Sequence, residues 1–386
     1  MQTSRICLEG TGGVEGGVMI PWATVETLAP QILSVASVGE VPRNFASCDR
    51  VVQRLLGKTP ALYDTLTTRD ITGMIRLVHL RAEDMDLTIP TRAGAHKLLL
   101  RPVLGPGGDV HAVRLWLGPA AAPIPPLRPA VGLIWELDTQ LIHQPIGLRR
   151  LCGVEAEEYV PRRSIAELFH RISKFDRHVE VLDLLYGPVP GQKLQFDAIV
   201  TSGSARRGQW RITMRARDDE RTRGAWLLIE DVTSDPMPSM APTLDHIGLR
   251  EAHRRAGTHL AIVQLEHATI AHWLTEPAPW VRWDYLFRPV DVFHPGDRAR
   301  LADLGGGLTS GDAAEVTVRT LNYQGGYTPT SLVLYPYPGY SVRPLTIAQL
   351  VHVGDDLPIA QPSDPVGYDE QLWRCRSNLM AHIPAH

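Results

Sequence analysis

Residues 128–233 carry an ordered series of strand and helix patterns, and this series constrains the fold more than any other part of the chain. Apolar runs at 131–137 and 141–143 are joined by an Asp-Thr turn, and two helical patterns follow. The first helical pattern begins at Ser164 with Glu167 three residues later, which is the spacing of a capping box. Three strand patterns complete the stretch. The predicted order is therefore two strands, two helices and three strands.

That order, and the way the stretch ends, resemble a PAS domain. The last strand pattern closes with Glu-Asp-Val-Thr at 230–233, and many PAS domains end their last strand in Asp-(Ile/Val)-Thr. A second resemblance lies at 294–297. There His-Pro-Gly-Asp is similar to the His-Pro-Asp-Asp segment before the last helix of many PAS domains, with Gly296 replacing the first Asp. The resemblance implies an antiparallel sheet around a small core, which is either packed solid or encloses a small molecule.

Hairpin patterns recur along the chain near residues 107, 220 and 340, at spacings of 113 and 120 residues. Repetition at a period close to the length of one PAS or GAF unit predicts a tandem array. The predicted fold class is α+β, with three tandem PAS/GAF-like domains, each an antiparallel sheet with short helices on one face. The layout resembles a family of actinobacterial three-domain PAS/GAF-like proteins that lack an attached output domain.

Proline-rich stretches at 120–129 and 234–242 predict linkers between neighbouring domains. The predicted divisions are a disordered lead-in at 1–20, a PAS- or GAF-like domain at 21–119, a PAS domain at 128–233, a second PAS-like domain at 245–354 and a tail at 355–386. Within the first domain, the spacing of apolar residues predicts a strand at 32–38, a helix at 68–81 and a hairpin at 97–117.

Charge and composition narrow the class of partner. The 386 residues include 39 basic and 42 acidic side chains, and the net charge of -3 gives no electrostatic reason to expect nucleic acid as the main partner. No apolar run approaches the ~20 residues that a membrane-spanning helix needs, so no transmembrane segment is expected. The 4 cysteines are scattered without a Cys-x-x-Cys pair, which favours a reducing cytoplasm over a disulfide framework or a zinc site.

No set of residues has a catalytic spacing, so the sequence predicts that the protein is not an enzyme. It contains no dinucleotide-binding, P-loop, Gly-x-Ser-x-Gly or His-Glu-x-x-His motif. Four of its 15 histidines lie close together in sequence, at 253, 259, 267 and 272, but neighbouring members lack the i, i+3 or i+4 spacing of metal ligands on a helix. Hydrogen-bonded or solvated histidines are therefore favoured over a metal site.

Cofactor signals are equally weak. His170 lies on the helix where some haem-binding PAS domains carry their axial histidine, but its neighbour Phe169 competes for the inward position. Cys152 stands in Leu-Cys-Gly-Val, which differs from the Asn-Cys-Arg-Phe-Leu-like helix of flavin photoreceptors. No cofactor is indicated, and haem and flavin are disfavoured.

Two sets of residues are candidates for binding. A small apolar ligand in the second domain would be lined by Leu133, Trp135, Phe169, Phe196, Val200, Trp210 and Ile212. The same apolar spacing is expected of an ordinary core. Strand alternation places Arg211, Arg215 and Arg217 on the face opposite the apolar residues of their strand. These arginines are either a docking surface for an acidic partner or another domain, or a solvated strand.

Three sensor-like repeats without an output domain favour a non-catalytic sensory or regulatory protein. It is expected to act in intracellular signalling through protein–protein contacts. A small apolar ligand or a protein partner would shift the population between interdomain arrangements. The alternative is a constitutive structural adaptor, whose domains are packed solid and bind no ligand.

Overall fold

The computed structural model describes most of the chain between residues 19 and 354. The described residues are 19–29, 31–152, 159–174, 177–201, 207–219, 222–233, 244–284, 286, 288–308, 313–337 and 345–354. Residues 1–18 of the predicted lead-in, the predicted linker at 234–242 and the predicted tail at 355–386 lie outside these ranges.

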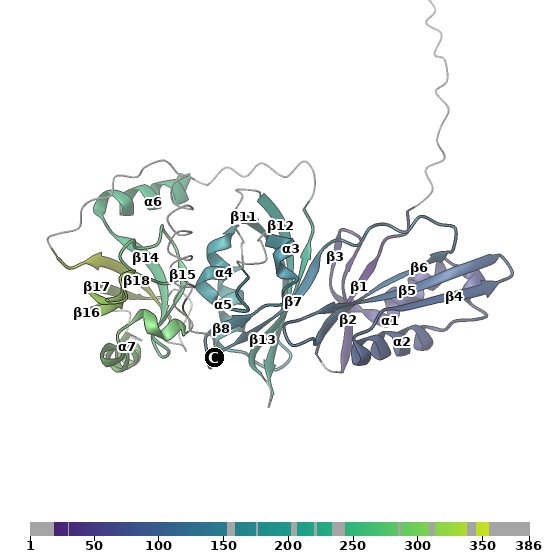
Figure 1. The fold of residues 1–386 in the computed structure, drawn as a ribbon, viewed down its shortest axis with the longest axis horizontal. Helices are drawn as coiled ribbons and strands as arrows, with labels where there is room; N and C mark the ends of the chain where they lie inside the picture. Colours follow the sequence, from purple (N-terminus) through teal and green to yellow (C-terminus); the bar gives the residue numbers. More distant parts are fainter. Residues whose placement is uncertain are drawn as a thin grey trace, which may run out of the picture. The chain divides into compact units, whose positions relative to one another are not determined.

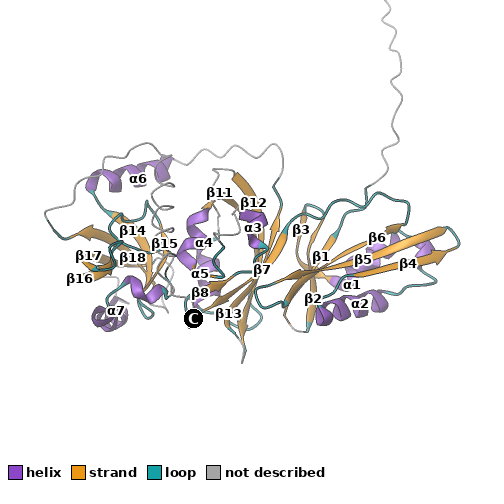
Figure 2. Cartoon of the chain, in the orientation of Figure 1, coloured by secondary structure: helices purple, strands orange, loops and turns teal. Residues whose placement is uncertain are grey.

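Three antiparallel sheets and a few short helices make up the described chain (Figure 1, Figure 2), so the α+β fold class is confirmed. The first sheet has six strands in the order β3-β2-β1-β6-β5-β4. Its elements are β1 (Ala23–Ala29), β2 (Ile32–Val38), β3 (Val41–Ser47), α1 (Cys48–Gly57), η1 (Pro60–Leu62), α2 (Thr68–Arg81), β4 (Met85–Thr91), β5 (Gly94–Leu104) and β6 (Val110–Pro119).

The second sheet has seven strands in the order β10-β11-β12-β13-β7-β8-β9. Its strands are β7 (Ala130–Glu136), β8 (Leu141–His143), β9 (Arg162–Ser164), β10 (Ile172–Lys174), β11 (Lys193–Thr201), β12 (Arg207–Asp218) and β13 (Arg223–Asp231). Its helices are α3 (Leu148–Cys152), α4 (Ile165–Arg171) and α5 (His178–Tyr186).

The third sheet has five strands in the order β15-β14-β18-β17-β16. Its strands are β14 (His259–Gln264), β15 (Thr269–Trp273), β16 (Ala314–Leu321), β17 (Tyr327–Pro336) and β18 (Leu345–His352). Its helices are α6 (Leu244–Ala256), the short η3 (Pro289–Val292) and α7 (Pro295–Gly307).

One strand arrangement recurs in all three sheets. In each sheet the first strand pairs antiparallel with the last: β1 with β6, β7 with β13, and β14 with β18. The second strand lies on the far side of the first, and the last three strands are neighbours in sequence order. The predicted internal repetition is therefore present as a repeated sheet topology, in which the last strand of each domain lies inside the sheet.

The chain divides into two compact units. The first unit contains Leu33–Pro102 and Ala112–Leu127 together with the residues up to Thr27, and it holds most of the first sheet. The second unit contains the residues from Arg128 onward, together with Leu28–Ile32 and Val103–His111. The second and third sheets thus belong to one compact unit, which also includes the two turn segments that follow β1 and β5.

The first domain contains three strands that the sequence did not predict. The predicted strand, helix and hairpin are present as β2, α2 and β5–β6. β1 was missed because polar residues interrupt its apolar run, although nearly all of the strand is buried. β3 contains a proline and two residues with positive φ, Asn44 and Phe45, which hide it from a pattern search.

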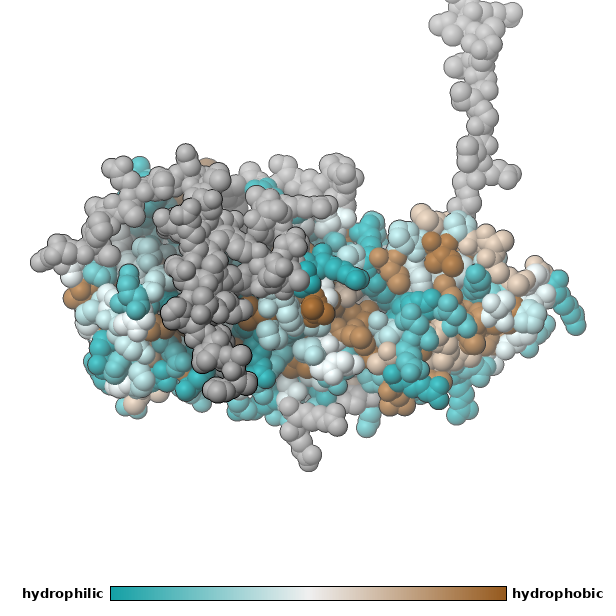
Figure 3. All heavy atoms as spheres, viewed as in Figure 1, coloured by the Kyte–Doolittle hydropathy of each residue, from teal (hydrophilic) through white to brown (hydrophobic). Residues whose placement is uncertain are grey.

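Hydrophilic and hydrophobic residues are interspersed on the face of the molecule drawn in Figure 3. Within the described part of the chain, every helix is too short or too polar to cross a membrane.

Candidate functional site

Helix α4 packs between the second and third sheets, and its residues belong to both cores. Leu168 and Phe169 lie in the core of the second domain, whereas Ala166 lies in the core of the third, where α4 contacts β15. In return, three buried apolar residues of the third sheet belong to the second core: Ile262, Ala271 and Leu345. The two domains therefore meet through shared apolar packing, and we call this region the α4–β15 junction.

A buried ion pair lies where α4 begins. The predicted capping box is present: Glu167 N donates to Ser164 Oγ, and Ser164 N donates to Glu167 Oε1, each at 3.3 Å. Arg163 Nη1 donates to the other carboxylate oxygen of Glu167 at 2.8 Å. The side chains of Arg163 and Glu167 are only 8% and 5% exposed. Glu167, which completes the capping box, is thus also half of a buried ion pair.

Asp284, from the segment between β15 and η3, brings a second carboxylate to the junction. It is buried, and Tyr323 Oη donates to its Oδ1 at 3.3 Å. Burial raises the pKa of Glu167; Arg163 lowers it, and the nearby charge of Asp284 raises it. Burial also raises the pKa of Asp284, and Arg163 is among the groups that lower it. The positive charge of Arg163 therefore acts on carboxylates from both domains.

Histidines and aromatic rings also contribute to the junction. The His272 ring of β15 meets Phe169 edge-on at a centroid distance of 5.3 Å and lies 6.0 Å from the His178 ring of α5. The His170 ring of α4 meets the Trp283 ring edge-on at a centroid distance of 5.1 Å. Burial lowers the pKa of His272 to about 3, and the charges of His178 and His170 lower it further. His272 is therefore held neutral at physiological pH.

Gln140 makes a third link between the two domains. It follows β7 in a left-handed conformation with φ 58°, and it is 1% exposed. Its amide Nε2 donates to Leu137 O at 2.7 Å, and its Oε1 accepts from Thr269 Oγ1 at 3.0 Å. Both polar ends of this buried side chain are thus satisfied, one within each domain.

Sequence reasoning identified Glu167 as a cap but missed the ionic character of the junction. Neither Arg163 nor Asp284 lies in a motif, and the two are far apart in sequence. One sequence feature could have indicated the ion pair: the capping box at Ser164 and Glu167 lies directly after Arg163. Among the described residues, no three His, Cys, Asp or Glu side chains are grouped so that they could hold a metal ion.

The predicted pocket residues come together in the core of the second domain. Phe196 is partly buried and packs against this core. The other six are buried within it: Leu133, Trp135, Phe169, Val200, Trp210 and Ile212. The indole Nε1 of Trp135 donates to Leu185 O at 2.9 Å, so its polar atom is satisfied within the domain. Ligand binding by this group stays a prediction.

The arginines predicted to form a docking or solvated face are not exposed as expected. Arg211 and Arg215 are only 3% and 5% exposed, because β12 is a central strand and is buried on both faces. Arg211 Nε and Nη2 donate to the two carboxylate oxygens of Asp197, at 2.9 and 3.0 Å. We therefore correct the interpretation of these two arginines: their side chains are buried and do not form a surface for an acidic partner.

Arg217 contacts a segment of the first predicted domain that belongs to the same compact unit. Its Nη1 donates to Leu28 O at 2.9 Å, and its guanidinium lies 4.4 Å from the centroid of the Trp226 ring. The His111 ring stacks on Trp226 at 4.6 Å with an interplanar angle of 6°. Gly132 permits this approach, because a Cβ there would lie 2.2 Å from the His111 ring. Of the two readings for Arg217, contact with another domain fits its geometry.

The Asp-Val-Thr segment closes the end of β13 onto β12. Asp231 Oδ1 accepts from Thr233 N at 3.0 Å, and Thr233 Oγ1 accepts from Gln209 N at 2.9 Å. The two polar residues of the motif thus satisfy backbone groups where the strand ends.

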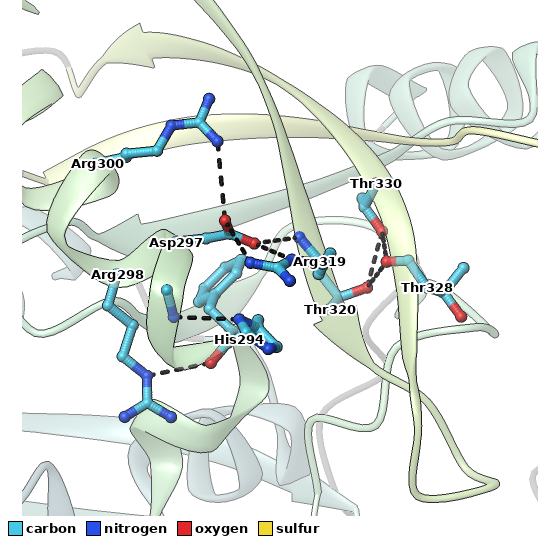
Figure 4. Close-up of polar contacts among 10 residues, drawn as sticks. His294, Asp297, Arg298, Arg300, Arg319, Thr320, Thr328 and Thr330 are labelled. Atoms are coloured by element: carbon cyan, nitrogen blue, oxygen red, sulfur yellow. Dashed lines mark hydrogen bonds and ion pairs between the residues drawn. The ribbon is translucent and has the colours of Figure 1, made fainter.

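The His-Pro-Gly-Asp segment fastens the start of α7 to β16 (Figure 4). His294 Nδ1 accepts from Gly296 N at 3.1 Å, and Asp297 Oδ2 accepts from Arg319 N and Nε, both at 2.9 Å. A Cβ at position 296 would lie 3.2 Å from Arg319 Nη2. Glycine at this position therefore leaves room for the Asp297–Arg319 pair.

These features define a multi-domain α+β protein with repeated antiparallel sheets. Two family models match it: the Rv3651-like N-terminal model over residues 21–126, and the Rv3651-like C-terminal domain model over residues 248–336. Together the two matched segments span just over half of the chain. The chain belongs to the Rv3651-like family.

One solved structure has a similar fold. A crystal structure of an uncharacterized protein from Mycobacterium tuberculosis has a TM-score of 0.70 and 17% sequence identity, and the match covers 87% of this chain and 97% of that chain. At this identity the likeness shows the fold alone. No curated protein matches the chain.

Two further structures are similar only at low TM-scores. An RNA-binding light-oxygen-voltage receptor has a TM-score of 0.23 and 12% identity, covering 64% of this chain and 99% of that chain. The periplasmic sensory domain of the Campylobacter jejuni chemoreceptor Tlp1 has a TM-score of 0.18 and 9% identity, covering 45% and 54%. Scores this low carry no argument about fold or function.

Proposed function

We propose that this chain is a non-catalytic regulatory protein, built from PAS-like modules, that acts through protein–protein contacts in cytoplasmic signalling. The recurrent sheet topology supports a tandem array of one kind of module, since each sheet places its first strand beside its last. The Asp-Val-Thr and His-Pro-Gly-Asp segments, which prompted the PAS resemblance, both accept hydrogen bonds from backbone N–H groups, at the end of β13 and at the start of α7. The assignment of the modules as PAS or GAF is part of the proposal.

The observation that carries the proposal is the position of α4 in two cores at once. A ligand or partner that shifts α4 in the second domain must also change its packing on the third. Coupling of this kind needs a contiguous packed element with two arrangements. In the proposed mechanism, binding to one module shifts the population of the α4–β15 junction and so alters the surface offered to a partner.

Within this proposal, a sensor and an adaptor differ in whether the second domain binds a small apolar ligand. A single substitution tests it: Ile212→Phe enlarges a predicted pocket residue. If the core is packed solid, the added volume destabilises the second domain by about 1–3 kcal/mol. If the core encloses a ligand space, the phenylalanine fills that space at little cost and abolishes ligand binding.

Leu332→Phe is the matched control, because Leu332 is fully buried in the third sheet and, as an isomer of isoleucine, gains about the same volume on substitution. The urea midpoint of each variant, followed by tryptophan fluorescence, gives the comparison. Equal losses in both variants favour the constitutive adaptor, whereas tolerance at position 212 alone favours the sensor.

Native and denaturing mass spectrometry of the full-length protein, with an absorption spectrum of the same sample, tests ligand binding directly. An extra non-covalent mass that is lost in Ile212→Phe supports a sensor with a ligand in the second domain. A bare polypeptide mass without absorption beyond the aromatic band favours the adaptor. Turnover of any substrate by the pure protein would overturn the non-catalytic proposal.

A further inference from the structure

His272 lies at the centre of the α4–β15 junction with an unsatisfied polar atom. Its Nδ1 is buried and has no hydrogen-bond partner among the described residues. Its ring meets Phe169 edge-on, and Ile262 is its register partner on β14. A neutral imidazole fits this apolar setting, but an imidazolium would bring a charge without a hydrogen-bond acceptor for Nδ1–H.

The charged groups that face His272 come from helices α4 and α5 of the second domain. His178 of α5 lies with its ring centroid 6.0 Å away, and His170 of α4 acts on His272 electrostatically. Arg171 and Arg250 act in turn on His170. The carboxylates at the junction are engaged elsewhere, since Glu167 pairs with Arg163. On the side of η3, Asp291 pairs with Arg298. A protonated His272 would therefore meet further positive charges.

The geometry points to a proton-responsive latch, in which protonation of His272 releases β15 of the third domain from α4 and α5 of the second. In the closed junction the ring is neutral and packs on Phe169. In the open junction Nδ1 of this half-buried ring reaches water and takes up a proton at the pH of an ordinary histidine. The inference rests on the junction alone and holds whether or not the modules are PAS domains.

The sign and size follow from proton linkage. The pKa of His272 is about 3 in the closed junction and 6.5 for an unperturbed histidine, so the open form binds more protons between these values. Opening becomes more favourable as the pH falls below 6.5, by roughly 30-fold between pH 7.5 and pH 5.0. Glu167 and Asp284 work in the opposite direction, because their raised pKa values favour the closed, protonated state at low pH.

Amide hydrogen exchange of the full-length protein tests the latch. Protection factors of β15 and α4, corrected for the intrinsic pH dependence of exchange, are expected to fall from pH 7.5 to pH 5.0 by roughly 30-fold more in the unmodified protein than in a variant without the His272 imidazole. The amides of β5, in the first sheet, are the internal reference and are expected to keep their protection.

The decisive variant is His272→Phe, which keeps an aromatic ring against Phe169 and removes the proton site. It is expected to abolish the pH-dependent fall. His267→Phe is the matched control, since His267 is a half-buried histidine of the same β-hairpin. It is expected to keep the fall.

A difference of less than about threefold between the unmodified protein and His272→Phe overturns the latch. If His272→Phe fails to fold, His272→Gln takes its place, because it also removes the titrating imidazole. The same difference from the unmodified protein is expected, and a difference of less than about threefold overturns the latch there as well.

Discussion

Two helices of this chain begin with the same ionic chemistry in different surroundings. At the start of α4, Glu167 caps the helix and pairs with Arg163, with side chains 5% and 8% exposed. At the start of α7, Asp297 lies in the first turn and pairs with Arg319, which is 47% exposed. One arginine–carboxylate pair thus lies inside a domain junction, and the other reaches solvent.

The two carboxylates respond to these surroundings in opposite ways. Burial raises the pKa of Glu167, whereas hydrogen bonds from Arg319 lower the pKa of Asp297. The difference shows that the position of an acidic residue in a helix motif does not fix its energetics. Water still solvates the Arg319 side of one pair, while the other pair depends on its protein partners for all of its solvation.

The largest predicted effect is at the buried pair. Arg163→Met keeps the apolar stem of the side chain but leaves Glu167 without its cation. Because an uncompensated buried charge remains, we expect a loss of about 3–5 kcal/mol in the stability of the second and third domains. The urea midpoint, followed by tryptophan fluorescence, measures it.

The double variant Arg163→Met/Glu167→Met is the control for this prediction. It replaces both charged groups by apolar ones, so most of the loss is expected to be recovered. A single variant that costs less than about 1 kcal/mol would show that the junction admits water and that the pair behaves as a surface pair.

A smaller effect is predicted at the exposed pair. Arg319→Ala removes the hydrogen bonds of the guanidinium to Asp297 but keeps the bond from the backbone N of residue 319. Because Arg319 is half exposed and water screens its pair with Asp297, we expect a loss of stability well below that of Arg163→Met. The same urea measurement on Arg319→Ala decides it, and a loss as large as that of Arg163→Met would erase the contrast between the two sites.

The sequence predicted local features well because they depend on neighbouring residues. The capping box at Ser164 and Glu167 and the helix at 68–81 follow from spacing alone, and the structure contains both. The repetition of hairpins likewise corresponds to a repeated sheet topology. Each of these signals lies within a short stretch of chain or in a regular period.

The junction could not be predicted because it is made by residues far apart in sequence. Asp284 and Arg163 are 121 residues apart and interact electrostatically only in the folded arrangement of the third sheet and α4. The same reason explains the arginines of β12. Alternation placed Arg211 and Arg215 correctly on the face opposite the core, but it cannot show that this face is also buried. Burial is a tertiary property, and it reversed the functional reading of these residues.

The smallest predicted effect is a difference in pH dependence between the two acids. The folded pKa of Asp297 is lowered, so its contribution is present above the unfolded value of 3.8 and is lost as the pH falls through the folded pKa. The destabilisation in Asp297→Asn is therefore expected to shrink by about 0.5 kcal/mol from pH 6 to pH 3.

Glu167 is expected to show the opposite slope. Its folded pKa is raised, so its proton-linked contribution is present below the unfolded value of 4.5 and is lost as the pH rises through the folded pKa. The stability of the unmodified protein relative to Glu167→Gln is thus expected to fall with rising pH. The stability of the unmodified protein relative to Asp297→Asn is expected to rise with rising pH. Urea midpoints across pH 3–7 for both variants give the two slopes. Slopes of the same sign would mean that the charge of Arg163 lowers the pKa of Glu167 by more than burial raises it. The pKa of Glu167 would then be lowered, like that of Asp297.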